Sequence, residues 1–217
     1  MSWQHEKVEF YGIQMTSLSK SPARGRPRTI THERIMNAGI EIGLLNITFV
    51  GVAAALGISH MALYKHISSL EELKYMIAEE IFTRWQIPLP STNRTVPLKD
   101  YLLEFMHSIR ELVKSNPGLT PYLIRRMAST PSMVAKIGTH HQVVAQAYSL
   151  SLDQARWLNS TIAFHCIAVA DTIYTVAGKE PTQALDRASE EADMEFEFMD
   201  SMQALIIGTL ALLETKK

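Results

Sequence analysis

Side chains that can bind phosphates or base edges occur at several positions between residues 48 and 67 of this 217-residue chain. Ser59 and Tyr64 carry hydroxyl groups, His60 carries an imidazole and Lys65 an ammonium group. Such groups can bind phosphates, and an ammonium or imidazole can also donate a hydrogen bond to the edge of a base. The stretch therefore suits contacts with a nucleic acid, and the alternative for each residue is a solvated helix face.

Three further residues of this stretch could join the same contacts. Met61 could touch a thymine methyl group, and His66 suits capping or phosphate binding better than catalysis. Thr48 could bind a phosphate through its hydroxyl or its amide, because it stands where a helix is expected to start. We therefore predict one contact surface, which consists of Thr48, Ser59, His60, Met61, Tyr64, Lys65 and His66.

The same stretch has the pattern of a helix-turn-helix. Its apolar residues predict two short helices, about 49–56 and 60–67, which pack on each other across a tight turn. Gly57 falls where the first helix would stop, because glycine accepts a positive φ, and Ser59 can N-cap the second helix. The small Ala53 lets the two helices approach closely. The apolar residues are Val52, Leu56, Ile58 and Leu63.

One helix is expected on each side of this motif. The first should begin near Thr31 and end at Asn46, with one buried apolar stripe. The last should run from about 70 to 86, with Ser69 as its N-cap and Glu72 as the second member of a capping box. The buried stripe of the first helix comprises Ile35, Ala38, Ile42 and Leu45.

Several short segments within roughly residues 24–82 form one recognisable set. They are RGRPR, Thr48, Val52-Ala53, Leu56-Gly57-Ile58-Ser59, Leu63-Tyr64-Lys65-His66-Ile67 and Ser69-Leu70-Glu71-Glu72-Leu73. With these segments the chain strongly resembles the TetR family of bacterial transcriptional repressors. The resemblance implies a homodimer on a near-palindromic double-stranded DNA operator, a small-molecule pocket in each C-terminal domain, and release from the operator when an effector is bound. It also implies that Tyr64 holds a phosphate through its hydroxyl while its ring packs.

The sequence departs from the family pattern at three places. Phe49, Val50 and Gly51 stand where the second helix often has a polar or basic residue near its start. Ala62 replaces a threonine before the Leu-Tyr pair, and Leu70 replaces a lysine at the start of the fourth helix. These changes remove phosphate contacts that the family often has, but they leave the helix-turn-helix pattern in place.

A basic segment precedes the motif. Arg24, Arg26 and Arg28 lie in a run that also holds two prolines and a glycine, and Arg34 and Lys65 extend the positive charge. Such a run buries no apolar area, so we expect residues 1–29 to form a flexible arm. An arm that follows phosphates or enters the minor groove is favoured over a solubilising tail, because it leads directly into a DNA-reading motif.

The remainder of the chain reads as helical. Helices are expected at about 97–115, 131–148, 152–177 and 184–213, with a short one around Tyr122. The last two long helices are apolar on most of their faces and so need burial on several sides. A symmetric dimer through a four-helix bundle would supply that burial, and the alternative is a monomer in which both are central core helices.

An effector pocket is expected among apolar residues of the C-terminal helices. For any single candidate a place in the core is the favoured reading, but together they suggest a largely apolar pocket with a few polar groups. We therefore predict a hydrophobic or aromatic effector. The candidates are Phe105, Met106, Ile109, Tyr122, Met127, His141, Tyr148, Trp157, Phe164, His165 and Tyr174.

Composition limits the remaining possibilities. A single cysteine, Cys166, excludes a disulfide framework within the chain, and the net charge of −1 gives no bulk signal for a nucleic acid. We see neither a signal peptide nor an apolar stretch of membrane-spanning length, and expect a cytoplasmic protein. Neighbouring histidines such as His140 and His141 point to different sides of a helix, so no metal or other cofactor is expected. No convergent set of catalytic groups is found, so no enzyme is predicted.

We therefore predict an all-α protein with three parts. These are a flexible basic N-terminal arm (1–29), a three-helix helix-turn-helix DNA-binding domain (30–76) and a helical effector-binding and dimerisation domain (77–217). Two alternatives stay open. One is a DNA-binding protein of this fold without an effector. The other is a helical small-molecule binding protein or enzyme whose helix-turn-helix no longer reads DNA.

Overall fold

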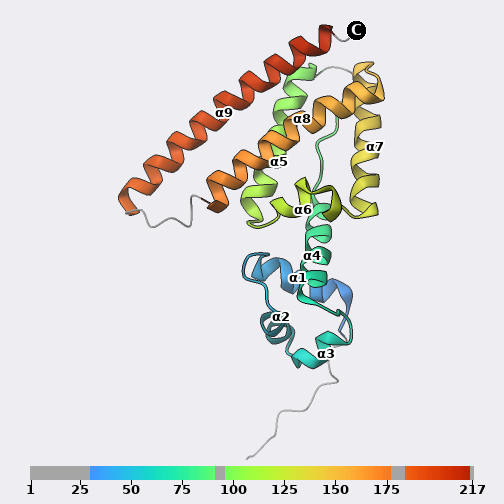
Figure 1. Cartoon of the computed structure of the whole chain (residues 1–217), viewed down its shortest axis with the longest axis vertical. Helices are drawn as coiled ribbons and strands as arrows, with labels where there is room; N and C mark the ends of the chain where they lie inside the picture. Colours follow the sequence, from blue (N-terminus) through green and yellow to red (C-terminus); the bar gives the residue numbers. More distant parts are fainter. Residues whose placement is uncertain (1–29, 91–95, 177–183, 216–217) are drawn as a thin grey trace, which may run out of the picture. The chain divides into compact units, whose positions relative to one another are not determined.

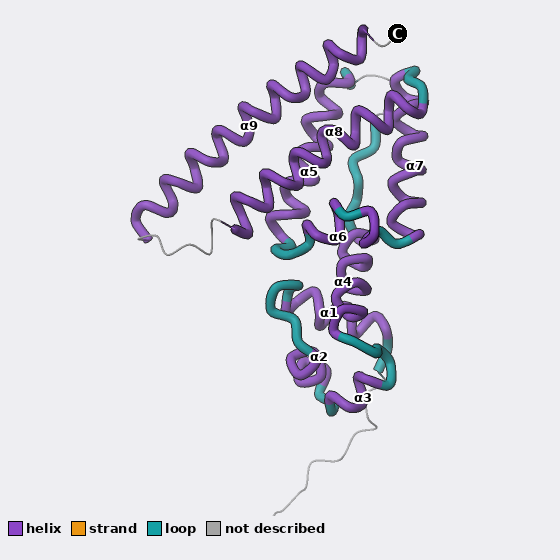
Figure 2. Tube along the Cα trace, in the orientation of Figure 1, coloured by secondary structure: helices purple, strands orange, loops and turns teal. Residues whose placement is uncertain are grey.

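The computed structural model describes residues 30–90, 96–176 and 184–215, and the regular structure within these ranges is entirely helical (Figure 2). This confirms the all-α prediction, whereas Arg24, Arg26 and Arg28 lie outside the described residues. The three-part division of the chain stays a prediction. The helices are α1 (His32–Ile42), α2 (Phe49–Leu56), α3 (His60–Tyr64), α4 (Leu70–Arg84), α5 (Leu98–Ser115), α6 (Thr120–Ile124), a 3-10 turn (Arg126–Ala128), α7 (Pro131–Tyr148), α8 (Leu152–Asp171), a π-helical turn (Thr172–Val176) and α9 (Ala184–Thr215) (Figure 1).

Helix α1 starts where its cap predicts and ends earlier than expected. The Thr31 hydroxyl accepts a hydrogen bond from the Arg34 amide at 3.3 Å, which satisfies one free N–H of the first turn. Gly43 follows the helix with a φ of 81°, a conformation that favours glycine. Because the chain turns there, Leu44 is buried and Leu45 is exposed. The prediction that the helix runs to Asn46 with Leu45 inside was therefore wrong.

Helices α1 and α4 approach closely at Gly39. A Cβ atom placed on Gly39 would lie 2.2 Å from the Cδ1 and 2.8 Å from the Cγ1 of Ile77. Ile77 is fully buried and branched at Cβ, so it has little freedom to move away. The absence of a side chain at Gly39 therefore sets the distance between these two helices.

Helices α2 and α3 form the expected helix-turn-helix. Gly57 has a φ of 69° and the left-handed conformation that ends α2. The hydroxyl groups of Thr48 and Ser59 accept amide hydrogen bonds at the starts of α2 and α3. Helix α3 ends at Tyr64, three residues before the predicted end, yet Ile67 is still buried.

The start of α4 differs from the predicted capping box in one respect. The Ser69 hydroxyl accepts a hydrogen bond from the Glu72 amide at 3.1 Å, as expected of an N-cap. The Glu72 carboxylate, however, accepts the Ser68 amide at 2.8 Å rather than the amide of Ser69. Hydrogen bonds from the Ser68 side chain and amide hold the pKa of Glu72 below its usual value.

The core of the C-terminal helices lies around α5 and α8, which pack on each other, while α7 and α9 contact α8. Cys166 is at its centre and donates a hydrogen bond to the Met106 carbonyl at 3.4 Å. Burial raises the pKa of this thiol to about 12, so it stays protonated and unreactive. The helix predicted from 152 to 177 is regular only as far as Asp171 and continues as the π-helical turn.

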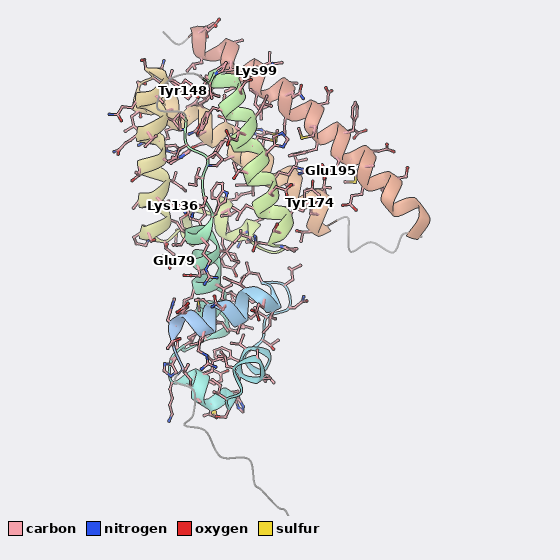
Figure 3. The ribbon with its side chains drawn as sticks, turned by 180° about the vertical axis from the view of Figure 1, so that it is seen from behind. Glu79, Lys99, Lys136, Tyr148, Tyr174 and Glu195 are labelled. Carbon is pink, nitrogen blue, oxygen red and sulfur yellow. The ribbon has the colours of Figure 1, made fainter. Side chains whose placement is uncertain are left out.

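Helix α9 is tied to α5 and to the π-helical turn by one charged cluster. The guanidinium of Arg110 binds both carboxylate oxygens of Glu195, and the Tyr174 hydroxyl donates to the same group (Figure 3). The Lys114 ammonium lies 3.4 Å from Glu195 and 4.8 Å from the centre of the Tyr174 ring. Burial acts to raise the pKa of Glu195, but the hydrogen bonds from Tyr174 and Arg110 outweigh it and keep the carboxylate charged.

The segment Ser189–Thr215 of α9 is long and apolar enough to cross a membrane, judged by length and composition alone. This corrects the expectation that the chain has no apolar stretch of that length. A single helix of this kind is weak evidence of membrane insertion, because a helix buried in a protein interface passes the same test. Phe198, Met202 and Ile206 on one side of the segment are already buried in the core.

We expect Gly39→Ala to lower the free energy of unfolding by about 1–3 kcal/mol, because the added methyl group overlaps Ile77. Gly138→Ala is the matched control, since among the described residues no atom outside the neighbouring helix backbone lies within 4 Å of a Cβ built at this helical glycine. The control should raise stability by about 0.5–1 kcal/mol through helix propensity. Urea unfolding of both variants measures the difference, and equal effects would contradict the proposed close contact.

Candidate functional site

The Tyr64 ring on α3 is held by Phe49 at the start of α2. The two rings are stacked, with centroids 4.2 Å apart and planes 8° from parallel. Phe49 is buried, whereas Tyr64 is 45% exposed, so one face of Tyr64 packs while the residue still reaches solvent. From the sequence alone, Phe49 is only a departure from a polar pattern. The structure gives it a positioning role that sequence reasoning missed.

The rest of α3 has the expected sidedness. His60, Met61, Lys65 and His66 are exposed, whereas Leu63 is fully buried. The His60 ring meets the Tyr64 ring edge-on at 6.4 Å. This places an imidazole, a thioether, an ammonium and a phenol on the exposed surface of one short helix and its end. Such a surface can supply both phosphate and base-edge contacts.

The hydroxyl groups of Thr48 and Ser59, on the same surface, cap the helices α2 and α3. Thr48 Oγ1 accepts the Gly51 amide at 2.9 Å, and Ser59 Oγ accepts the Ala62 amide at 3.2 Å. In each case the hydroxyl acts as the acceptor and can still donate its own hydrogen. Both residues are exposed, so capping leaves them able to donate to a phosphate.

Arg34 has a different role from the one that its charge suggested. Its guanidinium donates to the Leu56 carbonyl at 3.4 Å, near the C-terminus of α2. A cation there satisfies a carbonyl and complements the negative end of the helix dipole. Arg34 thus stabilises the helix-turn-helix from within.

A cavity of about 290 Å³ lies among the C-terminal helices. The end of α4 contributes Phe82 and Trp85 to its wall, α5 contributes Phe105, and α7 and α8 supply most of the remainder. Its lining is mainly apolar, and its volume is near the lower end of the range for small-molecule sites. The cavity therefore suits a compact ligand of largely apolar character.

The sequence-predicted pocket residues divide into two groups. Phe105, Ile109, His141 and Phe164 line the cavity. Met106 is buried in the core, Met127 is 96% exposed, and Tyr122 contacts Tyr75. The remaining candidates lie elsewhere. Tyr148 donates to the Val96 carbonyl, and Tyr174 binds Glu195. Trp157 and His165 line a shallow hollow along α8, which Phe164 also lines.

A polar group beside the cavity was not predicted. His140 Nε2 lies 2.8 Å from the Tyr101 hydroxyl, and its ring stacks on Phe105 with centroids 5.4 Å apart. Burial, with a smaller contribution from His141, lowers the pKa of His140 to about 4, so the ring is neutral near pH 7. Burial also raises the pKa of Tyr101. Asn159 on α8 completes this group. Beyond the helical spacing of single residues, no pattern in the sequence indicates this group.

No group of three or more metal-binding side chains occurs in the described ranges. His140 and His141 both line the cavity, with ring centroids 6.3 Å apart. Burial lowers the pKa of His141 as well. The pair therefore supplies two neutral imidazoles to a cavity wall.

Lys136 on α7 connects the cavity wall to the end of α4. Its ammonium donates to the carbonyls of Phe82 at 3.0 Å and Thr83 at 2.8 Å, and also to that of Trp85. Burial lowers the pKa of Lys136. A second link joins the same helices, since the Thr130 hydroxyl donates to Glu79 at 2.6 Å (Figure 3).

Comparison with solved structures identifies the fold. A variant of TetR from Acinetobacter baumannii AYE in complex with minocycline matches with a TM-score of 0.64 and 18% identity, over 85% of this chain and 99% of that one. ActR from Streptomyces coelicolor in complex with actinorhodin matches with a TM-score of 0.64 and 18% identity, over 85% and 97%. Apo ActR gives 0.64 and 16% over 89% and 100%. No family model matches the sequence, and no curated protein matches it significantly.

We expect the stability of the protein to fall on acidification as a result of His140. Below about pH 6.5 the unfolded chain takes up a proton at this position, while the folded chain resists it down to about pH 4. The folded state therefore loses on the order of 3 kcal/mol between these two pH values and no more below them.

The measurement is urea unfolding at several pH values. His140→Gln should flatten the pH dependence over this window relative to the unsubstituted protein. His107→Gln is the control, because His107 is an exposed residue of α5. If His140→Gln and His107→Gln retain the same dependence, burial of His140 is not its source.

Proposed function

We propose that this chain, which has the fold of the TetR-type regulators, is a DNA-binding transcriptional regulator controlled by a small molecule. One observation carries the proposal. Five residues separate the end of α3 from the start of α4, and α4 ends at Arg84, between Phe82 and Trp85 of the cavity wall. A single helix thus runs from the exposed α3 surface to the cavity. Any ligand that displaces the end of α4 can therefore change the DNA-reading surface.

Two proteins of similar structure support a ligand-controlled role. The Acinetobacter baumannii protein is in complex with minocycline and the Streptomyces coelicolor protein with actinorhodin. Each of these ligands was found in a complex of that protein, and neither is assigned to this chain. For this chain we propose a hydrophobic or aromatic effector, because the cavity wall is largely apolar and rich in aromatic rings.

Control would operate as a population shift. An effector that binds more tightly when the end of α4 is displaced favours the arrangement that does not bind DNA. Lys136 would be the coupling residue, since it holds three carbonyls at the end of α4 from the neighbouring α7. Release from an operator by the effector would make the protein a repressor.

A homodimer would place two α3 helices in successive major grooves, roughly 34 Å apart, on a near-palindromic operator. Exposed apolar residues on α8 and α9 support this assembly, because an exposed apolar stripe on two neighbouring helices suits a four-helix interface. Small exposed residues on α9 would allow close contact between its copies. The exposed residues are Val169 on α8, and Phe196, Ala204, Ile207, Gly208, Ala211 and Leu212 on α9. Operator binding in this form also implies a cytoplasmic location.

A second candidate function rests on Val50. This residue is 68% exposed in the first turn of α2, where a phosphate-binding surface would favour a polar group. A helical small-molecule binding protein, or an enzyme, whose helix-turn-helix no longer reads DNA would tolerate an apolar residue there. Alanine substitution of Arg24, Arg26 and Arg28 should weaken DNA binding at low salt only if the first proposal holds.

The decisive experiment is fluorescence anisotropy on labelled DNA from upstream of the chain's own gene, with a scrambled duplex for comparison. We expect Tyr64→Phe to weaken specific binding about tenfold through loss of a phosphate contact, with the salt dependence unchanged. Lys65→Ala should instead reduce the salt slope by about 1. Phe49→Leu keeps the apolar volume but frees the Tyr64 ring, and should also weaken binding.

Tyr148→Phe is the matched control, because it removes a hydroxyl that bonds to the Val96 carbonyl away from α3. It should bind DNA like the unsubstituted protein. Equal and weak binding of the unsubstituted protein to both duplexes would contradict DNA reading and favour the second candidate.

We expect Lys136→Met to loosen the end of α4, because three carbonyls lose a charged donor. Hydrogen exchange of peptides that cover residues 78–87 should become faster, while exchange in α5 stays unchanged. Lys99→Met is the control, since Lys99 is exposed on α5 (Figure 3). Unchanged exchange at the end of α4 would rule out Lys136 as the coupling residue.

A further inference from the structure

Two polar residues of the cavity wall contain side-chain atoms that the described part of the chain leaves without a hydrogen bond. Asn159 is 1% exposed, and neither its Oδ1 nor its Nδ2 has a partner there. His140 is 4% exposed, and its Nδ1 is likewise unpaired, although its Nε2 bonds to Tyr101. Both side chains line the cavity. Buried polar groups are normally satisfied, so these atoms point to a partner from the cavity itself.

Asn159 would be expected to bond to the nearby Tyr101 if its role were structural. A contact of one Asn159 amide N–H with the Tyr101 hydroxyl opposes the burial that raises the pKa of that hydroxyl. The Asn159 amide atoms do not, however, reach a hydrogen-bonding geometry, and the hydroxyl is engaged with His140 instead. The amide therefore keeps one donor and one acceptor that can serve a ligand.

The charge of the wall restricts what the partner can be. No lysine, arginine, aspartate or glutamate is among the described residues that line the cavity. His140 and His141, which also line it, have lowered pKa values and are neutral near pH 7. A carboxylate or an amine would lose its hydration on entry without meeting an opposite charge. The ligand should therefore be uncharged.

The shape of the wall favours a flat ligand. His140 and Phe105 are stacked within 22° of parallel, and Phe164, Phe82 and Trp85 line other parts of the cavity. Aromatic walls pack well against planar rings. A volume of about 290 Å³ can hold a compact ring system of a few fused rings.

We propose that this cavity selects an uncharged, flat aromatic molecule that carries a cyclic amide. The adjacent N–H and C=O of the lactam would pair with Oδ1 and Nδ2 of Asn159 in two parallel hydrogen bonds, with His140 Nδ1 as a further polar contact. The side-chain amide of asparagine can rotate by about 180°, which exchanges the positions of its oxygen and nitrogen, so either orientation of the lactam can be bound. This inference names the effector class for the proposed ligand-controlled regulator and rests on that function.

The test uses three fused-ring probes of nearly the same shape. Phenanthridinone has the lactam N–H and C=O, N-methylphenanthridinone lacks the donor, and phenanthrene lacks both groups. Isothermal titration calorimetry on the full chain should show phenanthridinone binding at least tenfold more tightly than either of the others. A naphthoate or phenanthrene carboxylate should not bind. Equal affinities for the three, or no binding of phenanthridinone, would overturn the inference.

Two variants locate the selectivity. Asn159→Leu should reduce the preference for phenanthridinone to twofold or less and leave phenanthrene binding intact. Ser160→Ala, at a neighbouring residue that also lines the cavity, should retain the preference. The reverse pattern would place the recognition elsewhere and contradict the inference.

Thermal unfolding without any probe gives an independent answer. If Asn159 is kept for a ligand, Asn159→Leu should not lower the melting temperature, because it replaces an unsatisfied buried amide with an apolar group of similar shape. A clear drop would mean that Asn159 has a structural partner, and would overturn the inference. Anisotropy on DNA separates the two proposals. Probe selectivity without DNA binding would contradict only the proposed DNA-binding function. DNA binding without probe selectivity would contradict only the proposed recognition of a lactam.

Discussion

The end of α4 depends on one ammonium group. The last carbonyls of any helix lack partners within the helix, and here Lys136 of α7 binds those of Phe82, Thr83 and Trp85. The charge lies at the negative end of the helix dipole, where a cation is favoured. Its own burial lowers the pKa of Lys136, so the carbonyls must compensate the ammonium for lost hydration. The ammonium and the carbonyls therefore stabilise each other at the end of α4.

This contact gives the neighbouring cavity its potential for control. Phe82 and Trp85 leave the same turn of α4 and form part of the cavity wall, while Met133 and Ile137 of α7 flank Lys136 and line it as well. The indole of Trp85 also donates to Ser108 on α5 at 2.8 Å. A ligand that moves either aromatic ring therefore acts on the lysine contact directly. At the other end, close packing at Gly39 leaves α1 little freedom to move independently of α4.

The polar group beside the cavity illustrates a conflict between stability and selectivity. A fully apolar lining would stabilise the fold, because unpaired buried amide atoms are unfavourable. Within the described residues, Asn159 keeps both amide atoms without a hydrogen-bond partner. Such a residue can reject a ligand that lacks the matching groups far more strongly than an apolar wall can, because mismatched polar atoms stay unsatisfied in the complex. The unfavourable group in the free protein is then the source of discrimination in the bound one.

Local patterns in the sequence were enough to predict the helices and much of the α3 surface. Ser59, Ser69 and Gly57 act on their own neighbours, so caps and turns could be placed to within a few residues. Contacts between distant segments could not be anticipated in the same way. The stacking of Phe49 on Tyr64, the reach of Lys136 to α4 and the meeting of Tyr101, His140 and Asn159 each join separate helices. Helical periodicity reports which residues are apolar, but it does not report which apolar face borders a cavity. For that reason Phe105 and Phe164 were identified while Asn159 was missed.

The composition of α9 fits both a membrane-crossing helix and a helix at a protein interface. Its pattern of burial helps to distinguish the two. A helix that crosses a membrane alone meets lipid on every side, so no single face needs protein contacts. In α9, by contrast, Phe198, Met202, Ile206 and Leu213 recur at helical spacing and are buried. Ile207 and Leu212 lie outside this buried face and are exposed, with small residues between them. One covered face and exposed apolar residues outside it are what a helix shared between two subunits requires, and this favours a second copy of the chain over a lipid bilayer as the partner of α9.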